Sequence, residues 1–285
     1  MFKTAMLALD LSPVEEPLLD FIPELLDWGV ERLVIVHLIR SGYMQDPDDR
    51  KLEDATAWLE WRAAPLRAAG FQVSVSVRKA GVSADEILSA AAEAGVDLLV
   101  AGSRSQNLVN RLFLGSIARD LVRKTPLPLL LQWIEPDAEG AAGRCSAVFT
   151  ETLRRVLLAT DLSKYASAAE QAAIALAGRA SKIDCVTVLT RHAIDATPAL
   201  TLMTRAALDA LVRQIEANGG HGEALVLEGE PIEVIQRLAE ARWSTLIIIG
   251  KHGQNWMQSM LIGRTALRLC ESAGRPVLLV PLPDG

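Results

Sequence analysis

The chain has 285 residues, of which half are apolar and 22% are charged, and its formal net charge is −6. This composition is typical of a globular protein with two ordinary domains and excludes a disordered or collagen-like chain. The negative charge argues against a non-specific nucleic-acid surface, because such affinity comes mainly from neutralised phosphates.

Short Val, Ile and Leu runs alternate with amphipathic segments along the first half of the chain. The apolar runs predict strands at residues 3–9, 33–39, 71–77, 97–102 and 127–133. The segments between them predict helices at residues 14–28, 48–69, 83–94 and 115–124. The strands show little polar alternation, which is typical of parallel strands covered on both faces. Acids follow turn residues in "GVSADEIL" and "GEPIEVI", which favours helix starts at both places.

The second half of the chain repeats the first. "FKTAMLALDLS" (2–12) is echoed by "LRRVLLATDLS" (153–163), so that Asp10 corresponds to Asp161 at an offset of 151. Gly102 corresponds to Gly250, and Gly115 to Gly263, both at an offset of 148. Offsets this similar indicate a duplicated domain.

The strand and helix pattern predicts a doubly wound α/β sheet in each copy. We expect one domain at residues 1–136, a linker at 137–151 and a second domain at 152–285. The small and polar "EPDAEGAAGRCSA" (135–147) favours the linker.

Ligands of doubly wound sheets bind at the carboxyl ends of the strands, where both copies place an aspartate and a glycine segment. In the second copy Gly250 is followed by Gly253 and then by Gly263. We expect such glycines to allow positive φ and the close approach of a ligand. The helix expected after Gly263 would offer free N–H groups and a positive dipole end to a phosphate. Neither Gly-x-x-x-x-Gly-Lys-Ser/Thr nor a Gly-x-Gly-x-x-Gly after the first strand occurs, which excludes Walker-type binding and argues against the usual dinucleotide fold.

The combined pattern resembles the universal stress protein family, which carries Gly-x-x-Gly, nine residues and Gly-Ser/Thr, with an aspartate ending the first strand. The matching text is "DLS" at 10–12 and 161–163, "GSRS…GS" at 102–116 and "GKHG…GRT" at 250–265. The resemblance covers nearly the whole chain as two tandem domains. It implies two Rossmann-like domains, each a five-stranded parallel sheet with helices on both faces, of the adenine nucleotide alpha hydrolase-like type. It also implies binding of ATP or AMP, with Mg²⁺ as a possible companion.

The resemblance further implies which residues would contact the nucleotide. Residues at the strand ends would border the adenine and ribose, and the glycine segment with the following helix start would hold the phosphates. In the first copy these residues are Asp10, Leu38, Ala101, Gly102, Arg104, Ser105, Gly115, Ser116 and Ile117. In the second copy they are Asp161, Val188, Ile249, Gly250, His252, Gly253, Gly263, Arg264 and Thr265.

Both copies depart from the family pattern. Ser105 replaces the second glycine of the first copy; if that position needs left-handed geometry, a non-glycine residue there costs roughly 1–2 kcal/mol. Arg264 stands in the second copy where the family has Ser or Thr. Its guanidinium suits a phosphate, whereas its bulk would also fill the phosphate pocket; Thr265 supplies a hydroxyl beside it.

Each of these residues also has a purely structural interpretation. Asp10 and Asp161 are equally typical of turn or helix capping. His252 fits a solvated loop, and His37 fits a hydrogen-bonded core or edge position. Trp58 and Trp61 form a helical stripe that we expect to pack against the sheet or a partner.

The sequence shows no recognisable catalytic motif: we find no paired nucleophile and base, no metal-ligand cluster and no carboxylate pair at a spacing typical of catalysis. We therefore expect an adenine-nucleotide-binding stress-response module rather than a dedicated enzyme, with slow ATP hydrolysis as an alternative. A further alternative is a tandem scaffold whose nucleotide sites have degenerated. An adenylating enzyme would need Ser-Gly-Gly-x-Asp-Ser after the first strand, where this chain has "DLSPVEE" and "DLSKYAS". A response-regulator receiver domain would need two adjacent acidic residues at the end of the first strand, where this chain has only Asp10.

The remaining features concern the compartment and the assembly. The three cysteines show no paired spacing and suit a reducing compartment, and no apolar run approaches the roughly 20 residues of a membrane span, so we expect a cytoplasmic protein.

The final strands, "PLPLLLQW" (126–133) and "PVLLVPLP" (276–283), resemble those that make the family's dimer contact. We expect the two copies to pair within one chain as a pseudo-dimer, with a homodimer of chains as a further possibility and no nucleic-acid or membrane partner.

Overall fold

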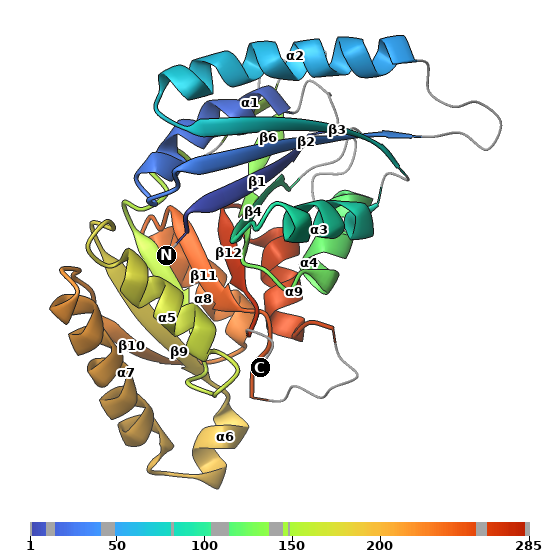
Figure 1. Cartoon of the computed structure of the whole chain (residues 1–285). Helices are drawn as coiled ribbons and strands as arrows, with labels where there is room; N and C mark the ends of the chain where they lie inside the picture. Colours follow the sequence, from blue (N-terminus) through green and yellow to red (C-terminus); the bar gives the residue numbers. More distant parts are fainter. Residues whose placement is uncertain are drawn as a thin grey trace. The chain divides into compact units, whose positions relative to one another are not determined.

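The computed structural model describes residues 2–9, 15–40, 49–80, 83–103, 114–136, 145–147, 149–254 and 261–282. By their contacts these residues form two compact units. One contains residues 2–125 and 132–148, and the other contains residues 126–131 and 149–285. Each unit is a sheet of mostly parallel strands with helices on both faces, as the sequence predicts (Figure 1).

The first unit is built on four parallel strands in the order β4-β1-β2-β3. These strands are β1 (Thr4–Leu9), β2 (Arg32–Arg40), β3 (Gln72–Ala80) and β4 (Leu98–Gly102). The helices are α1 (Glu15–Phe21), continued by the 3-10 helix η1 (Ile22–Leu26), α2 (Asp49–Ala68), α3 (Ala84–Glu93) and α4 (Ser116–Lys124). Helix α2 packs on β2 and β3, while α3 packs against α4.

The second unit repeats this order as β10-β9-β8-β11-β12, all parallel. Its strands are β8 (Val156–Ala159), β9 (Ile183–Leu189), β10 (Ala224–Glu228), β11 (Leu246–Gly250) and β12 (Val277–Val280). Its helices are α5 (Ser167–Leu176), α6 (Arg191–Ala196), α7 (Leu200–Ala217), α8 (Pro231–Ala241) and α9 (Arg264–Ser272).

Two details differ from the expected pair of five-stranded domains. Strand β5 (Leu129–Gln132), the fifth strand of the first copy, lies mostly within the second unit, where it pairs antiparallel with β12. Within the expected linker, β7 (Cys145–Ala147) pairs antiparallel with β6 (Ile134–Pro136) and contacts α1. Part of the predicted linker therefore forms a β-strand, which its polar composition does not predict.

The cores consist of the Val, Ile and Leu runs that predicted the strands. Every residue of β8, β11 and β12 is buried. Helix starts also follow the sequence: the Ser83 hydroxyl accepts the Glu86 N–H at 3.3 Å, and Pro231 occupies the first turn of α8. Among the described residues no helix is long and apolar enough to cross a membrane.

Candidate functional site

The candidate site lies at the carboxyl ends of the parallel strands, where the second copy brings its Asp161 turn and its glycine segment together at one sheet edge. The second copy is described almost completely there. In the first copy, Asp10, Arg104 and Ser105 lie outside the described residues, so the site is built below mainly from the second copy.

The loop after β8 is organised by a buried threonine. The Thr160 hydroxyl accepts the Leu162 N–H at 2.9 Å and donates to Glu170 Oε1 at 2.6 Å. This bond holds Leu162 at φ 58°, in the left-handed region that a branched side chain rarely adopts. Burial raises the pKa of the half-buried Glu170 carboxyl; the Thr160 hydrogen bond opposes that shift and the nearby Asp161 charge adds to it. The loop thereby fixes the position of Asp161.

Asp161 connects the loop after β8 to the glycine segment after β11. Its Oδ1 accepts the Ser163 N–H at 3.0 Å, and its Oδ2 accepts the Gln254 N–H at 2.5 Å. A Cβ added to Gly253 would lie 2.6 Å from the same Oδ2. The absence of a side chain at Gly253 therefore makes room for the Asp161 carboxylate.

The glycines of this segment do not adopt the positive φ that we expected from the sequence. Gly250, Gly253 and Gly263 all lie outside the left-handed region. Gly250 is instead required by close packing, since an added Cβ would lie 3.2 Å from Ala166 Cα and 3.1 Å from the His252 carbonyl oxygen. The expected strain at Ser105 assumed that this position needs a left-handed backbone. Its counterpart Gly253 does not have a left-handed backbone, so the second copy gives no support for that strain.

Gly263 differs from the other two glycines. It is the N-cap of α9 with φ −68° and ψ 145°, angles that any residue adopts, and an added Cβ would make only ordinary contact, 3.4 Å from the Lys251 carbonyl oxygen. That carbonyl accepts the Gly263 N–H at 2.8 Å, which ties the helix start to the end of β11. Neither backbone angle nor packing within the described protein requires glycine here.

The start of α9 leaves its first-turn N–H groups available to an anion. Among the described residues no side chain caps the helix, its first turn contains no acid, and Arg264 is exposed at its first position. A cation at this end of a helix is unfavourable against the dipole unless an anion lies beside it. The exposed Arg264 is not enclosed among the described residues of the second unit.

The first copy presents the same helix start. Gly115 is the N-cap of α4 with φ −55° and ψ 156°, with no side-chain cap and no acid in the first turn. Ser116 is exposed and Ile117 is half-buried beside it. By contrast, α3 has both a Ser83 cap and the first-turn acids Asp85 and Glu86. Helix α7 also starts without a side-chain cap or a first-turn acid, at Ala199, but α4 and α9 combine such a start with a glycine at the N-cap.

The remaining predicted residues lie at the strand ends. Leu38, Ala101 and Ile249 are buried, and Val188 is half-buried. A Cβ on Gly102 would lie 2.8 Å from Ile134 Cδ1, so that this glycine accommodates a side chain of its own unit. Within the described parts of the chain, no contact brings Leu38 or Val188 to the helix starts.

His252 is more constrained than the solvated loop histidine considered from the sequence. Its Nε2 donates to the Leu261 carbonyl at 3.2 Å, and the ring is partly buried. Burial lowers the pKa of His252, the bond to Leu261 opposes the shift, and Lys251 adds to it. The ring is therefore held in its neutral form more strongly than a free imidazole.

Sequence reasoning missed the link between the first two strands of each copy. His37 Nδ1 lies 2.8 Å from the Leu9 carbonyl oxygen, and at the corresponding place in the second copy the Thr187 hydroxyl donates to the Thr160 carbonyl at 2.8 Å. The interpretation of His37 as a hydrogen-bonded core histidine is confirmed, since the residue is 8% exposed. The repeat alignment could have revealed the pair, because an offset of 150 places His37 opposite Thr187.

The two tryptophans of the expected stripe lie in different environments. Trp61 is 66% exposed, whereas Trp58 is half-buried on the side of α2 that faces β2. The Arg62 guanidinium lies over both rings, 5.7 Å from the Trp58 centroid and 5.5 Å from that of Trp61. Trp61 instead contributes a cation–π contact on the outer side of the helix.

Fold and site together define a duplicated, doubly wound α/β protein with an open helix start behind the fourth strand of each copy. A model of the universal stress protein family matches residues 1–131 and 152–281. The chain therefore belongs to the universal stress protein family.

Individual relatives agree with this assignment. The universal stress protein in the QAH/OAS sulfhydrylase 3′ region of Thermus aquaticus is 30% identical over 138 residues, covering 46% of this chain and 98% of that protein. The crystal structure of a universal stress protein from Archaeoglobus fulgidus DSM 4304 has a TM-score of 0.74 and 23% identity, covering 97% and 98% of the two chains. A protein of unknown function from Pseudomonas aeruginosa PAO1 has a TM-score of 0.69 and 16% identity, covering 99% and 94%. At these identities the two structures establish the fold alone.

Proposed function

We propose that the protein binds adenine nucleotides, ATP or AMP, and acts in the stress response as a sensor or binding module rather than as a dedicated enzyme. The observation that supports this most directly is Gly263. It is the one glycine of the second copy's motif that neither backbone angle nor packing within the described protein requires. Keeping a side chain away from exposed N–H groups is the remaining physical reason for glycine at this position.

The electrostatics of α9 support a phosphate at its start. The first-turn N–H groups carry the positive end of the helix dipole, and the first turn contains no acid to balance it. Arg264 adds a guanidinium with the fork geometry that matches phosphate oxygens. A phosphate would satisfy both groups at once, and in the first copy Ser116 would add a hydroxyl in the same role.

Asp161 limits how this site can work. Its two oxygens are already used by the Ser163 and Gln254 N–H groups. We therefore assign it the role of holding the glycine segment against the loop after β8, with any contact to a ribose made by the remaining lone pairs. Among the described side chains no group of three metal-ligating residues is present, so any Mg²⁺ would be held largely by the nucleotide.

The experiment that tests this proposal is isothermal titration with ATP and AMP, comparing the wild type with Gly263→Ala and Arg264→Gln. We expect Gly263→Ala to change unfolding stability by less than about 1 kcal/mol and to weaken ATP binding at least about tenfold. Arg264→Gln should weaken ATP about threefold to tenfold, with a smaller effect on the less charged AMP. Arg268→Gln, one turn further along α9, is the matched control and should leave both affinities unchanged.

The scaffold alternative is favoured by one observation, the antiparallel pairing of β5 with β12. This pairing supports an intramolecular pseudo-dimer and needs no nucleotide. In a pure scaffold ATP would not bind at millimolar concentration, and Gly263→Ala and Arg264→Gln would match the wild type in every measurement.

A further inference from the structure

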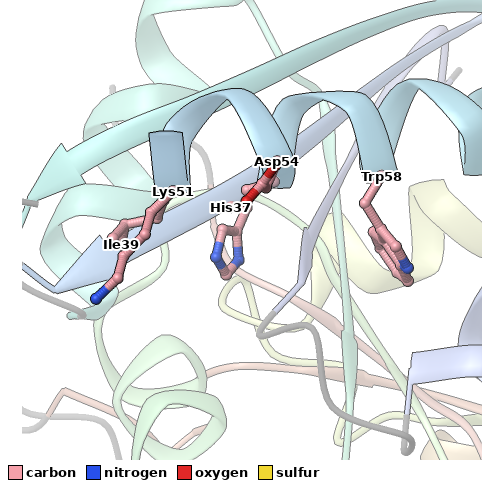
Figure 2. Close-up of a pocket in the computed structure, with 6 residues that line it drawn as sticks. His37, Ile39, Lys51, Asp54 and Trp58 are labelled. Carbon is pink, nitrogen blue, oxygen red and sulfur yellow. The ribbon is translucent and has the colours of Figure 1, made fainter. Parts of the chain in front are cut away.

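A shallow cavity of about 500 Å³, open to solvent, lies in the first copy between the end of β2 and the first half of α2 (Figure 2). Its volume falls within the range of roughly 300–1,000 Å³ that is usual for small-molecule sites. The lining residues are His37, Ile39, Lys51, Asp54, Ala55 and Trp58. The four from α2 are spaced i, i+3, i+4 and i+7, so they form one face of the helix, and Figure 2 shows Asp54 next to His37, Lys51 beside Ile39 and Trp58 further along the helix.

This cavity is distinct from the nucleotide site proposed above. None of Leu38, Ala101, Gly102 and the α4 start contributes to its described lining. Successive side chains of a strand point to opposite faces of the sheet. His37 and Ile39 therefore point to the α2 face, while Leu38 between them points to the other.

His37 offers the cavity a hydrogen-bond acceptor that no described residue occupies. The Leu9 carbonyl can only accept, so Nδ1 is the donor in that bond, and in the neutral ring Nε2 then has a free lone pair. Nε2 has no partner among the described residues, although the side chain is more than nine-tenths buried. In the second copy Thr187 makes the same bond to the strand carbonyl without a second nitrogen. The structural role of His37 therefore does not require its Nε2.

The rest of the lining is suited to a flat ring with polar edges. Trp58 is half-buried and offers an aromatic surface, and Ala55 and Ile39 form the apolar wall. Lys51 and Asp54 are exposed at the rim and make no ion pair with another residue that the structure describes. Their opposite charges favour a ligand without net charge, because a charged ligand would be repelled by one of them.

We propose that this cavity binds a flat nitrogen heterocycle bearing an exocyclic amino group. The ring would stack on Trp58, the amino group would donate to His37 Nε2 and to the Asp54 carboxylate, and Lys51 would donate to a ring nitrogen. The amino edge determines recognition, because His37 Nε2 and Asp54 both accept hydrogen bonds there. The site is a second, phosphate-independent ligand site in the first copy.

The test is titration of the whole chain at pH 8 with 4-aminoquinazoline, a probe without ribose or phosphate, followed by calorimetry and by the indole ¹H–¹⁵N signal of Trp58. Quinazoline, which lacks the amino group, should bind about tenfold more weakly. His37→Thr keeps a donor for the Leu9 carbonyl, as Thr187 does for Thr160, and should weaken 4-aminoquinazoline, which keeps its bond to Asp54, while leaving quinazoline affinity and the thermal midpoint near the wild-type values. Equal affinity for both probes, or unchanged binding to His37→Thr, would overturn the proposal.

A matched pair of tryptophans tests the stacking surface. Trp58→Leu should weaken 4-aminoquinazoline at least about tenfold, whereas Trp61→Leu, three residues further along α2 and outside the cavity, should not change it. If both variants lose affinity equally, or neither does, the probe does not stack on Trp58 and the proposed site is wrong.

The outcome is separable from that of the nucleotide proposal. Saturating ATP should not displace 4-aminoquinazoline, and Gly263→Ala should bind the probe normally. Displacement by ATP in parallel with loss in His37→Thr would show that the cavity is the base end of a nucleotide site, which would overturn the claim of a separate one. Failure of ATP to bind at all, with probe binding intact, would overturn only the nucleotide proposal.

Discussion

At the scale of single residues, Gly253 is required by a neighbouring carboxylate rather than by its own backbone angles. Because an added Cβ would lie 2.6 Å from Asp161 Oδ2, Gly253→Ala must displace that carboxylate and weaken its bond to the Gln254 N–H. We expect a loss of about 1–2 kcal/mol in the free energy of unfolding, measured by urea titration.

A double-mutant cycle isolates this contact. In an Asp161→Ala background the Cβ of Gly253→Ala has room, and alanine reduces the entropy of the unfolded chain. We expect the substitution to be neutral or slightly stabilising there. Equal losses in the two backgrounds would show that the carboxylate is not the reason for this glycine.

His252 provides a pH dependence with a definite sign. Burial lowers the pKa of its ring in the folded state, with opposition from the Leu261 bond. The folded state thus favours neutral imidazole, so the contribution of His252 to stability is complete above about pH 6.5 and is lost as the pH falls through the lowered folded pKa.

We expect the stability difference between the wild type and His252→Gln to shrink on going from pH 7.5 to pH 5, measured by urea unfolding at each pH. NMR titration of the ring should place its pKa below that of a free histidine. Addition of ATP should raise this pKa, because a nearby phosphate favours the charged ring. A pKa that ATP leaves unchanged would place the phosphates away from His252.

At the scale of elements, the connection from β8 to α5 depends on the Thr160 hydroxyl. This group satisfies the Leu162 N–H in a left-handed turn and donates to the half-buried Glu170. Thr160→Val keeps the shape and removes both bonds, so we expect a loss of about 2–3 kcal/mol. The pKa of Glu170 should rise further, because the hydrogen bond that lowers it is gone.

The measurement for Thr160→Val is urea unfolding combined with NMR titration of Glu170. Thr187→Val, which removes a single buried hydrogen bond in the adjacent strand, serves as the comparison and should cost less. A Thr160→Val protein as stable as the wild type would show that the loop does not rely on this hydroxyl.

The elements also show how far the sequence determines the fold and where it does not. Buried parallel strands and helix starts were predictable, because apolar runs and the Ser83 and Pro231 signals are local. The partner of β5 and the β6–β7 pair were not, because strand pairing depends on distant segments.

The sequence indicated a candidate site but not the reasons for its glycines. Their spacing identified the segment after β11, whereas Gly250 and Gly253 are explained by contacts with Ala166 and Asp161 that spacing cannot show. Gly250 and Gly253 have no room for a side chain whereas Gly263 has, and this difference appears only when the space for an added Cβ is known at each position. The Trp58 cavity was also missed, since the stripe gave no sign of which ring faces β2.

At the scale of the whole molecule, two buried thiols report on opening of the second unit. Cys185 in β9 and Cys270 in α9 are buried and free, and burial raises the pKa of each thiol to about 12, with smaller contributions from nearby acids. In a Cys145→Ala variant at pH 8, we expect both to react with a disulfide reagent roughly a thousandfold more slowly than in urea. Rapid native reaction of either thiol would show that the second unit opens locally.

The same reaction tests cooperativity. Cys185 and Cys270 lie in one contact unit, so a unit that opens as a whole should expose both at a common rate. Bound ATP should slow both reactions, because a ligand that binds only the folded state stabilises it by mass action. Two well-separated rates would indicate that strand β9 and helix α9 open independently.

The most direct test of the central claim is mass spectrometry of small molecules released by denaturing the purified, full-length protein after incubation with millimolar ATP and gel filtration. Adenine nucleotide should be recovered from the wild type, at up to two molecules per chain, and much less should be recovered from Gly263→Ala. Recovery of no nucleotide from a folded wild-type protein would contradict the assignment of the open helix starts to phosphate binding.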